Sequence, residues 1–198
     1  DYIRYTQTDA GYPAWNNPLS SYARWQAAGG SWDDFRRRTI DELVRRVRWE
    51  IPLITTNPRQ PVRQSADVIS NGSPPGDCNF GGTSAYGLFQ NYALWMQRGY
   101  VDAIMPMIYK RDHCPNQYND FRNWCDRILN CWRYQRHVFC GPATYLNDFD
   151  SSLAQMQYAL IAANGVATYS YAGSRVTETI CEDPPQDPWT TDHSWFNY

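Results

Sequence analysis

Apolar residues recur at two different spacings that alternate along the chain. Helical spacing predicts four helices, over residues 32–51, 84–98, 119–135 and 151–163. Short apolar, β-branched or aromatic runs predict four strands, over residues 61–70, 101–109, 137–145 and 165–171. Alternating helices and strands imply right-handed crossovers and a mostly parallel sheet. The pattern therefore predicts an α/β fold.

Local signals set the ends of the first predicted helix. Ser31 is a suitable N-cap, and Asp33 and Asp34 bring negative charge to the first turn, where the helix dipole favours it. Pro52 is expected to end this helix, because proline lacks the backbone N–H that helix continuation requires. Its many arginines are expected to form a solvated face.

The later helices are delimited in the same way. Gly99 is expected to end the second helix as its C-cap. In the fourth helix the apolar spacing predicts an inward stripe of Leu153, Met156, Leu160 and Ile161.

Composition excludes several classes of protein. The 198 residues are 42% hydrophobic, which is too apolar for a disordered chain, and the net charge of −2 disfavours a nucleic-acid partner. No apolar run approaches the roughly 20 residues of a membrane span. We expect one domain over residues 1–181 and an irregular tail, rich in proline and tryptophan, over 182–198. Neither a nucleotide-binding glycine motif nor a nucleophile elbow is present, so no cofactor is expected.

The cysteines indicate a compartment. An even number of cysteines without C-x-x-C spacing predicts three disulfides and an oxidising, secreted location, although six buried thiols of a cytosolic protein are the alternative. The best local metal-ligand cluster is His113 beside Cys114, which is too small to predict a metal site. The six are Cys78, Cys114, Cys125, Cys131, Cys140 and Cys181.

Three motifs resemble a known family. They are D-Y-I-R-Y at 1–5, W-x-x-F-R-R at 32–37, and W-x-x-x-G-x-V-D-x-I-x-P-M-x-Y at 95–109. Over most of residues 1–171 the sequence resembles the glycoside-hydrolase-like family ten proteins. That resemblance implies a (βα)8 TIM barrel in a secreted or periplasmic bacterial protein that hydrolyses glycan strands, including peptidoglycan stripped of its peptides.

The resemblance also implies an incomplete barrel. It puts Asp1 at the carboxyl end of the fourth barrel strand, so the four predicted strands would be strands five to eight. The chain would then contain only about the last four to five βα units. The rest would come from a longer chain, another chain or self-association with a second copy.

Glycoside hydrolysis generally uses two carboxyl groups, and in barrels these lie at the carboxyl ends of strands. Asp1 is the candidate nucleophile or electrostatic stabiliser, and Asp112 is the candidate general acid. Asp148 and Glu178 are reserves. Alternatively, Asp112 pairs with Arg111 or caps a turn.

Substrate contacts are expected from side chains near the strand ends, since aromatic faces stack on sugars and arginine or asparagine binds their polar groups. Asp102, at the start of its strand, is expected to be structural. We therefore predict a secreted glycoside hydrolase acting on a polysaccharide, with a non-catalytic glycan-binding or self-assembling extracellular subunit as the alternative. The candidate substrate-binding residues are Arg4, Tyr5, Met107, Tyr109, Tyr145, Asn147, Tyr169 and Tyr171.

Overall fold

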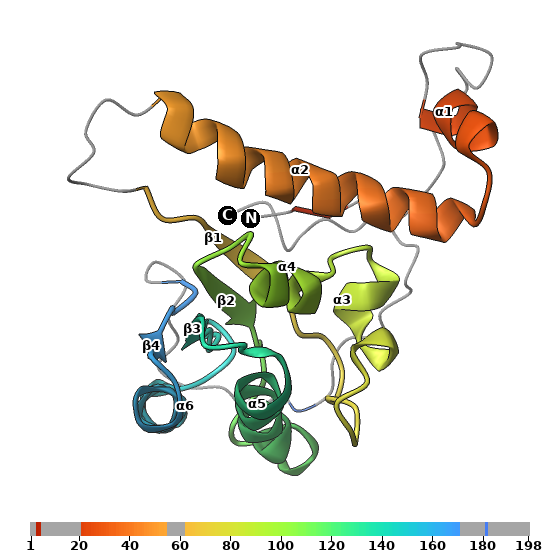
Figure 1. Cartoon of the computed structure of the whole chain (residues 1–198). Helices are drawn as coiled ribbons and strands as arrows, with labels where there is room; N and C mark the ends of the chain where they lie inside the picture. The colour runs from red at the N-terminus through yellow and green to blue at the C-terminus, as the bar shows by residue number, and fades with distance from the viewer. Residues whose placement is uncertain (1–2, 5–20, 55–61, 171–180, 182–198) are drawn as a thin grey trace.

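The computed structural model describes residues 3–4, 21–54, 62–170 and 181. Within these ranges the chain forms a parallel four-stranded sheet with the strands side by side in chain order (Figure 1). This confirms the predicted α/β class and all four predicted strands. The strands are β1 (Ser65–Ile69), β2 (Ala103–Met107), β3 (His137–Cys140) and β4 (Gly165–Val166).

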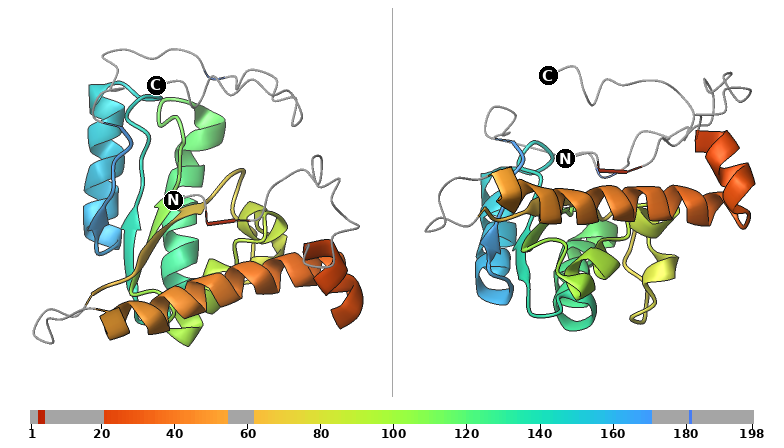
Figure 2. Two further views of the ribbon diagram at one scale, coloured as in Figure 1. Left: turned by 90° about the horizontal axis from the view of Figure 1, so that it is seen from above. Right: turned by 45° about the horizontal axis from the view of Figure 1, so that its top comes forward.

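Helices precede the first strand and join each strand to the next. Figure 2 shows α2 crossing above the sheet, and α5 and α6 running alongside the strands. The helices and helical turns are α1 (Ser21–Ala28), α2 (Trp32–Ile54), η2 (Phe80–Gly82), α3 (Ser84–Gly87), α4 (Tyr92–Arg98), α5 (Pro115–Arg127), η3 (Ile128–Trp132) and α6 (Phe149–Ala162).

The two faces of the sheet differ in burial. Side chains that alternate along a strand point to opposite faces, and the pairing puts Ile104 and Val138 on the same face, where both are fully buried. That face packs on a core with Trp95 and Trp124. On the opposite face, residues such as Met105 are only half-buried. Among the described residues, the helix layer therefore covers one face of the sheet.

The predicted second helix is two helices. Gly99 has a left-handed backbone and ends α4 as expected, but α3 ends at Gly87. Between them, Phe89 has a φ of 60°, which interrupts the helical hydrogen bonds. After this break, the buried Gln90 side chain bonds to the backbone of two other segments. Its carbonyl oxygen accepts from Ile69 N–H at 2.6 Å, and its amide donates to Ile3 O at 3.2 Å. Through these two hydrogen bonds, Gln90 holds Ile3 beside the end of β1.

The α2 helix differs from its prediction in length and in its arginine face. Its backbone stays helical to Ile54, because Pro52 lies in the last turn, where its missing N–H removes a single helical hydrogen bond. Arg36 and Arg37 are buried rather than solvated. Their guanidinium carbons lie 4.1 Å from the Phe89 ring centre and 3.6 Å from that of Tyr86, respectively. Cation–π stacking therefore brings this part of the arginine face against the loop around α3.

Asp102 has the structural role that its position predicted. Its carboxylate accepts hydrogen bonds from Arg48 at 2.6 Å and from the Gln64 N–H at 2.9 Å, and it lies 3.4 Å from Arg63. Burial raises the pKa of Asp102, but the hydrogen bonds and positive charges outweigh burial, so its pKa falls below the usual value. The carboxylate thus ties α2 to the amino-terminal edge of the sheet.

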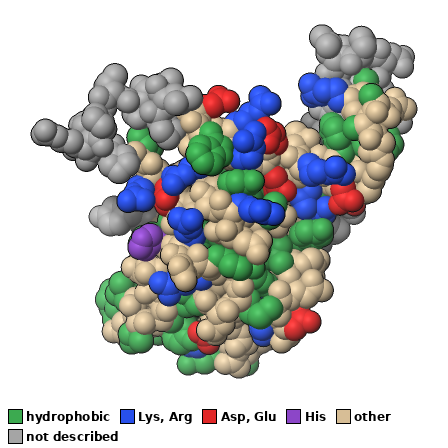
Figure 3. Space-filling view, in the orientation of Figure 1, with side chains coloured by type: hydrophobic (Ala, Val, Ile, Leu, Met, Phe, Trp, Pro, Cys, Tyr) green, Lys and Arg blue, Asp and Glu red, His purple; other side chains and the backbone are tan. Residues whose placement is uncertain are grey.

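The α6 helix contradicts its predicted orientation. Leu153, Leu160 and Ile161 are exposed, and Ile161 is 87% exposed. The buried face instead contains Gln155 and Ala159. Figure 3 shows apolar side chains gathered at the surface over α6, at the lower left. The apolar spacing correctly grouped these residues on one side of the helix, but that side faces outwards.

Two disulfides are formed, not the predicted three. Cys78 is bonded to Cys131 and Cys114 to Cys181. Cys125 and Cys140 remain as buried thiols. Burial raises the pKa of the Cys125 thiol, and the neighbouring Cys140 raises it further. The last two cysteines therefore meet as thiols between α5 and β3.

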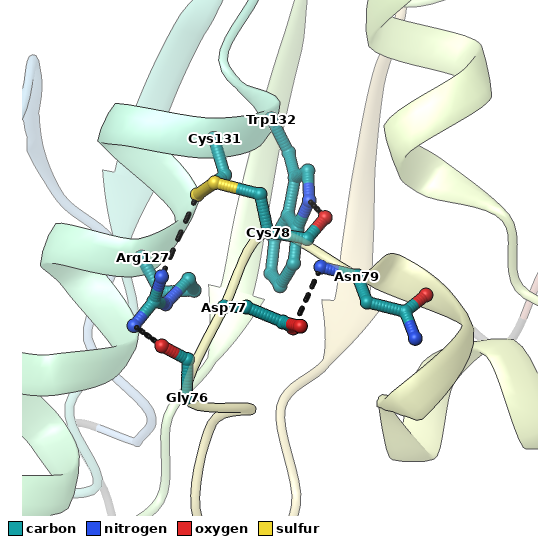
Figure 4. Close-up of a disulfide and its surroundings, with 7 residues drawn as sticks. All are labelled: Gly76, Asp77, Cys78, Asn79, Arg127, Cys131 and Trp132. Atoms are coloured by element: carbon teal, nitrogen blue, oxygen red, sulfur yellow. Dashed lines mark hydrogen bonds between the residues drawn. A yellow bond between two sulfur atoms is a disulfide. The ribbon is translucent and has the colours of Figure 1, made fainter.

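Figure 4 shows how the first disulfide joins the loop after β1 to the helical segment after α5. Trp132 Nε1 donates to the Cys78 carbonyl at 3.0 Å. Arg127 donates to the Gly76 carbonyl at 2.9 Å and lies 3.8 Å from the Cys131 sulfur. The covalent bond and these polar contacts fix the same loop.

Within the described ranges, the helices are too short or too polar for any of them to span a membrane.

Candidate functional site

Three tyrosines meet at the carboxyl ends of the strands. Tyr109, Tyr145 and Tyr169 follow β2, β3 and β4, respectively, and are called the tyrosine triad below. The rings of Tyr109 and Tyr169 stack with centres 5.6 Å apart, and Tyr145 stands edge-on to both at 5.9 Å. Tyr169 is 49% exposed, and the other two are half-buried. All three were predicted as substrate contacts, and the structure brings them together.

Backbone pairing beyond the strands positions the triad. Thr144 N–H donates to Tyr169 O at 2.8 Å, and Tyr169 N–H donates to Pro142 O at 3.1 Å. Gly141 pairs with Met107, and a Cβ at Gly141 would lie 2.7 Å from the Pro106 carbonyl oxygen. Glycine is therefore required where the loops after β2 and β3 approach each other.

The Asn147 side chain joins the loops after β2 and β3 through hydrogen bonds. Its amide donates to Lys110 O at 2.8 Å and to Ala143 O at 2.9 Å, and its oxygen accepts from Asp112 N–H at 2.7 Å. The residue is fully buried. In this arrangement Asn147 presents no accessible atom to a substrate, so we assign it the positioning of the loops instead of the substrate contact inferred from sequence.

Asp112 lies in the loop that follows the carboxyl end of β2, as predicted. Its carboxylate is directed towards the helices α5 and α6. Arg122 of α5 donates to it at 2.6 Å, and Gln155 of α6 lies at 3.5 Å. Asp112 is 9% exposed. The alternative inferred from sequence paired Asp112 with the adjacent Arg111; the structure provides Arg122 instead, which lies about two turns into α5.

The other predicted residues are spread around this edge. Met107 ends β2 and is half-buried, as is Arg4. Asp148 caps α6: the hydrogen bond from Ser151 N–H, at 2.8 Å, lowers the pKa of Asp148, and His113 contributes in the same direction. The positions outside the described residues are Asp1, Tyr5, Tyr171 and Glu178.

Sequence reasoning missed one residue here and found a second group only in part. Lys110, the only lysine of the sequence, is 8% exposed, and its Nζ lies 4.0 Å from Asp120. The second group is His113, Cys114 and Cys181, whose ligand atoms all lie within 4.8 Å of one another. His113 and Cys114 are adjacent in sequence, but only the fold could add Cys181, which lies 67 residues from Cys114.

No protein-family model matches the chain, and no curated protein gives a significant match to it.

Proposed function

We propose that the chain binds a polysaccharide across the tyrosine triad and belongs to a secreted glycoside hydrolase of the (βα)8-barrel type. The observation that carries this proposal is the triad itself. Three aromatic rings from three successive strand ends form one cluster, and Tyr169 leaves about half of its surface open to a ligand. Aromatic rings provide flat apolar surfaces with a polar hydroxyl edge, which suits a sugar.

The sheet supports a barrel. Its strands are parallel and follow chain order, with helical connections, as in consecutive βα units. Barrel enzymes bind substrates at the carboxyl ends of the strands, where the triad lies. The half-buried face of the sheet would line the barrel interior. Two disulfides are typical of proteins in oxidising compartments, which supports secretion.

Binding is tested by replacing the most exposed ring of the triad. Tyr169→Ala should weaken binding to peptide-free peptidoglycan strands by about tenfold, which corresponds to about 1.4 kcal/mol. Tyr134 is a matched control, because it is 45% exposed but precedes β3 and so belongs to the opposite edge of the sheet. Equal losses in Tyr169→Ala and Tyr134→Ala, measured by calorimetry, would refute a binding site at the triad.

Hydrolysis would use Asp1 and Asp112 as the carboxyl pair. Asp112 also holds Arg122, so a loss of activity in Asp112→Asn alone is ambiguous. Arg122→Gln removes the same ion pair but keeps the carboxylate. The release of new reducing ends should disappear in Asp112→Asn and persist in Arg122→Gln. Equal losses in both variants would make Asp112 a structural residue.

One observation favours the non-catalytic alternative, a glycan-binding subunit. The Asp112 carboxylate faces Arg122 and Gln155 instead of open solvent. A wild-type protein that binds the glycan strands and never shortens them would establish this alternative.

A further inference from the structure

A second chemistry is available beside the proposed glycan site. The loop after β2 supplies His113 and Cys114, and the C-terminal segment supplies Cys181. The imidazole nitrogen and the two sulfurs all lie within 4.8 Å of one another, and the sulfurs form a disulfide. One nitrogen and two sulfurs are a ligand set that zinc prefers.

The spacing is close to that of a zinc site. In a tetrahedral site, with Zn–S near 2.3 Å and Zn–N near 2.0 Å, neighbouring ligand atoms lie about 3.5–3.8 Å apart. Two bonded sulfurs would therefore have to separate by less than about 2 Å. A change of side-chain rotamer covers that distance. The imidazole nitrogen lies within 4.8 Å of both sulfurs, so it has to move closer by about 1 Å at most.

Cys114 lies where a helix begins. Cys114 is the N-cap of α5, a helix of 13 residues, and its side chain makes no capping hydrogen bond. The partial positive charge at the start of a helix stabilises a nearby thiolate. A thiolate is the form of cysteine that binds a metal.

We propose that reduction of the Cys114–Cys181 disulfide creates a zinc site formed by His113, Cys114 and Cys181. A dithiol reductant breaks this bond by thiol–disulfide exchange. The reductant is oxidised to a disulfide, and its two hydrogens pass to the cysteines, which become thiols. Each thiol then releases one proton as its sulfur binds the zinc ion. Three protein ligands leave the fourth position to water or to another small ligand. Either state connects the loop after β2 to Cys181, through a covalent bond when oxidised and through zinc when reduced.

The first test uses the wild-type chain. The protein is reduced, one equivalent of zinc is added under anaerobic conditions, and the cysteines are labelled with a thiol alkylating reagent. Arginines divide the six cysteines among six different tryptic peptides, so each cysteine is measured separately. Zinc should slow alkylation of Cys114 and Cys181 at least tenfold and leave Cys78 and Cys131 unchanged. Equal protection of all four, or of none, would overturn the proposal.

A second test identifies the ligands. Cobalt(II) titrated into the reduced protein should give the visible absorption of a four-coordinate site and a sulfur-to-metal charge-transfer band, at one cobalt per chain. Cys181→Ser should abolish the charge-transfer intensity that comes from one sulfur. His113→Ala should weaken cobalt binding at least about tenfold, the lower end of the losses in metal affinity seen when residues around a metal are replaced. The Cys125→Ser/Cys140→Ser double variant is the control and should bind normally. Binding that survives in Cys181→Ser and is lost in the control would overturn the proposal.

The oxidised protein completes the comparison. Its sulfurs are bonded to each other, so it should bind no cobalt at the same concentration. Binding by the oxidised protein with the same spectrum would show that these cysteines are not the ligands. This inference is independent of the proposed glycan site, because none of its readouts involves a polysaccharide.

Discussion

The helices α5 and α6 follow successive strands, yet they bury different side chains. Besides Gln117, α5 buries the large or apolar Phe121, Trp124 and Cys125. α6 buries only Ser152, Gln155 and Ala159, and it exposes Leu153, Leu160 and Ile161. The difference follows from position. α5 lies in the middle of the helix layer, where α6 contacts it and its η3 extension contacts α4, whereas α6 lies at the β4 end of the described sheet.

The comparison teaches what apolar spacing can and cannot specify. Spacing identifies the residues that share one side of a helix. Which side turns inwards depends on the neighbours. Ser152 and Ala159 are small and buried, and Gln155 donates to the Lys110 carbonyl at 3.0 Å. Small side chains and a polar contact thus take the place of the apolar stripe.

The largest expected effect on stability comes from α5, the helix that buries large apolar side chains. Trp124→Ala should lower the free energy of unfolding by about 4 kcal/mol, because it removes a fully buried indole and leaves a cavity. The Gly72 carbonyl, which accepts from Trp124 Nε1 at 2.8 Å, also loses its partner. Leu160→Ala on the exposed side of α6 is the control and should change stability by less than about 0.5 kcal/mol. Similar losses in urea unfolding of the two variants would remove the contrast between the helices.

The next effect concerns the polar contact beneath α6. Gln155→Ala should cost about 2 kcal/mol in urea unfolding, because it leaves a cavity at a fully buried side chain and removes one of the two donors to the Lys110 carbonyl, the other being Asn147. Gln157 lies on the exposed side of the same helix, so Gln157→Ala is the matched control and should have little effect. A loss below that of the control would mean that Gln155 does not hold α6 in place.

A smaller effect should appear as a pH dependence of the free energy of unfolding, which comes from Asp41 of α2. Asp41 accepts a hydrogen bond from Trp95 Nε1 at 2.6 Å. Burial raises the pKa of Asp41 from 3.8 to about 6, although the hydrogen bonds from Trp95 and Asn91 and the charge of Arg37 oppose it. Between these two values the folded protein retains a proton that the unfolded chain has released. The free energy of unfolding therefore falls as the pH rises through this window.

Asp41→Asn keeps the acceptor for Trp95 and removes the charge. Above pH 6, the variant should be more stable than the wild type by roughly 1–2 kcal/mol, after allowance for solvent access to Asp41. At pH 4 the difference should largely vanish. Parallel pH profiles of the thermal midpoint in the two proteins would show that Asp41 does not titrate in this way.

The smallest effect on stability is expected at the exposed stripe of α6. Leu160→Ser combined with Ile161→Ser should change the free energy of unfolding by less than about 0.5 kcal/mol, since both side chains are largely in solvent. Large exposed apolar patches promote association, so the variant should remain monodisperse at higher concentration in light scattering. A large loss of stability would show that this side of α6 is buried in solution.

Local pattern was sufficient for the strands and for several caps. The short apolar, β-branched or aromatic runs located all four strands, and Ser31 and Gly99 lie where α2 begins and where α4 ends. The break at Phe89 was not predictable, because it depends on Gln90 bonding the backbone of β1, which is distant in sequence.

The candidate site was predictable in part for the same reason. The triad tyrosines each follow a strand, so chain order alone places them at one edge of the sheet. The partners of Asp112 and of Cys114 come from other elements, α5 and the C-terminal segment. Such pairings depend on how helices are rotated and where loops end, and no local pattern encodes them.

Lys110 has a practical consequence for reagent chemistry. It is the single lysine of the sequence, and its ε-amine lies almost buried in the loop that leads from β2 towards Asp112. An acylating reagent aimed at lysine therefore has one side-chain target in these 198 residues. Its rate of reaction in the folded protein, relative to the unfolded chain, reports how often this one loop opens. A fluorophore attached there would mark the candidate site without any engineered residue.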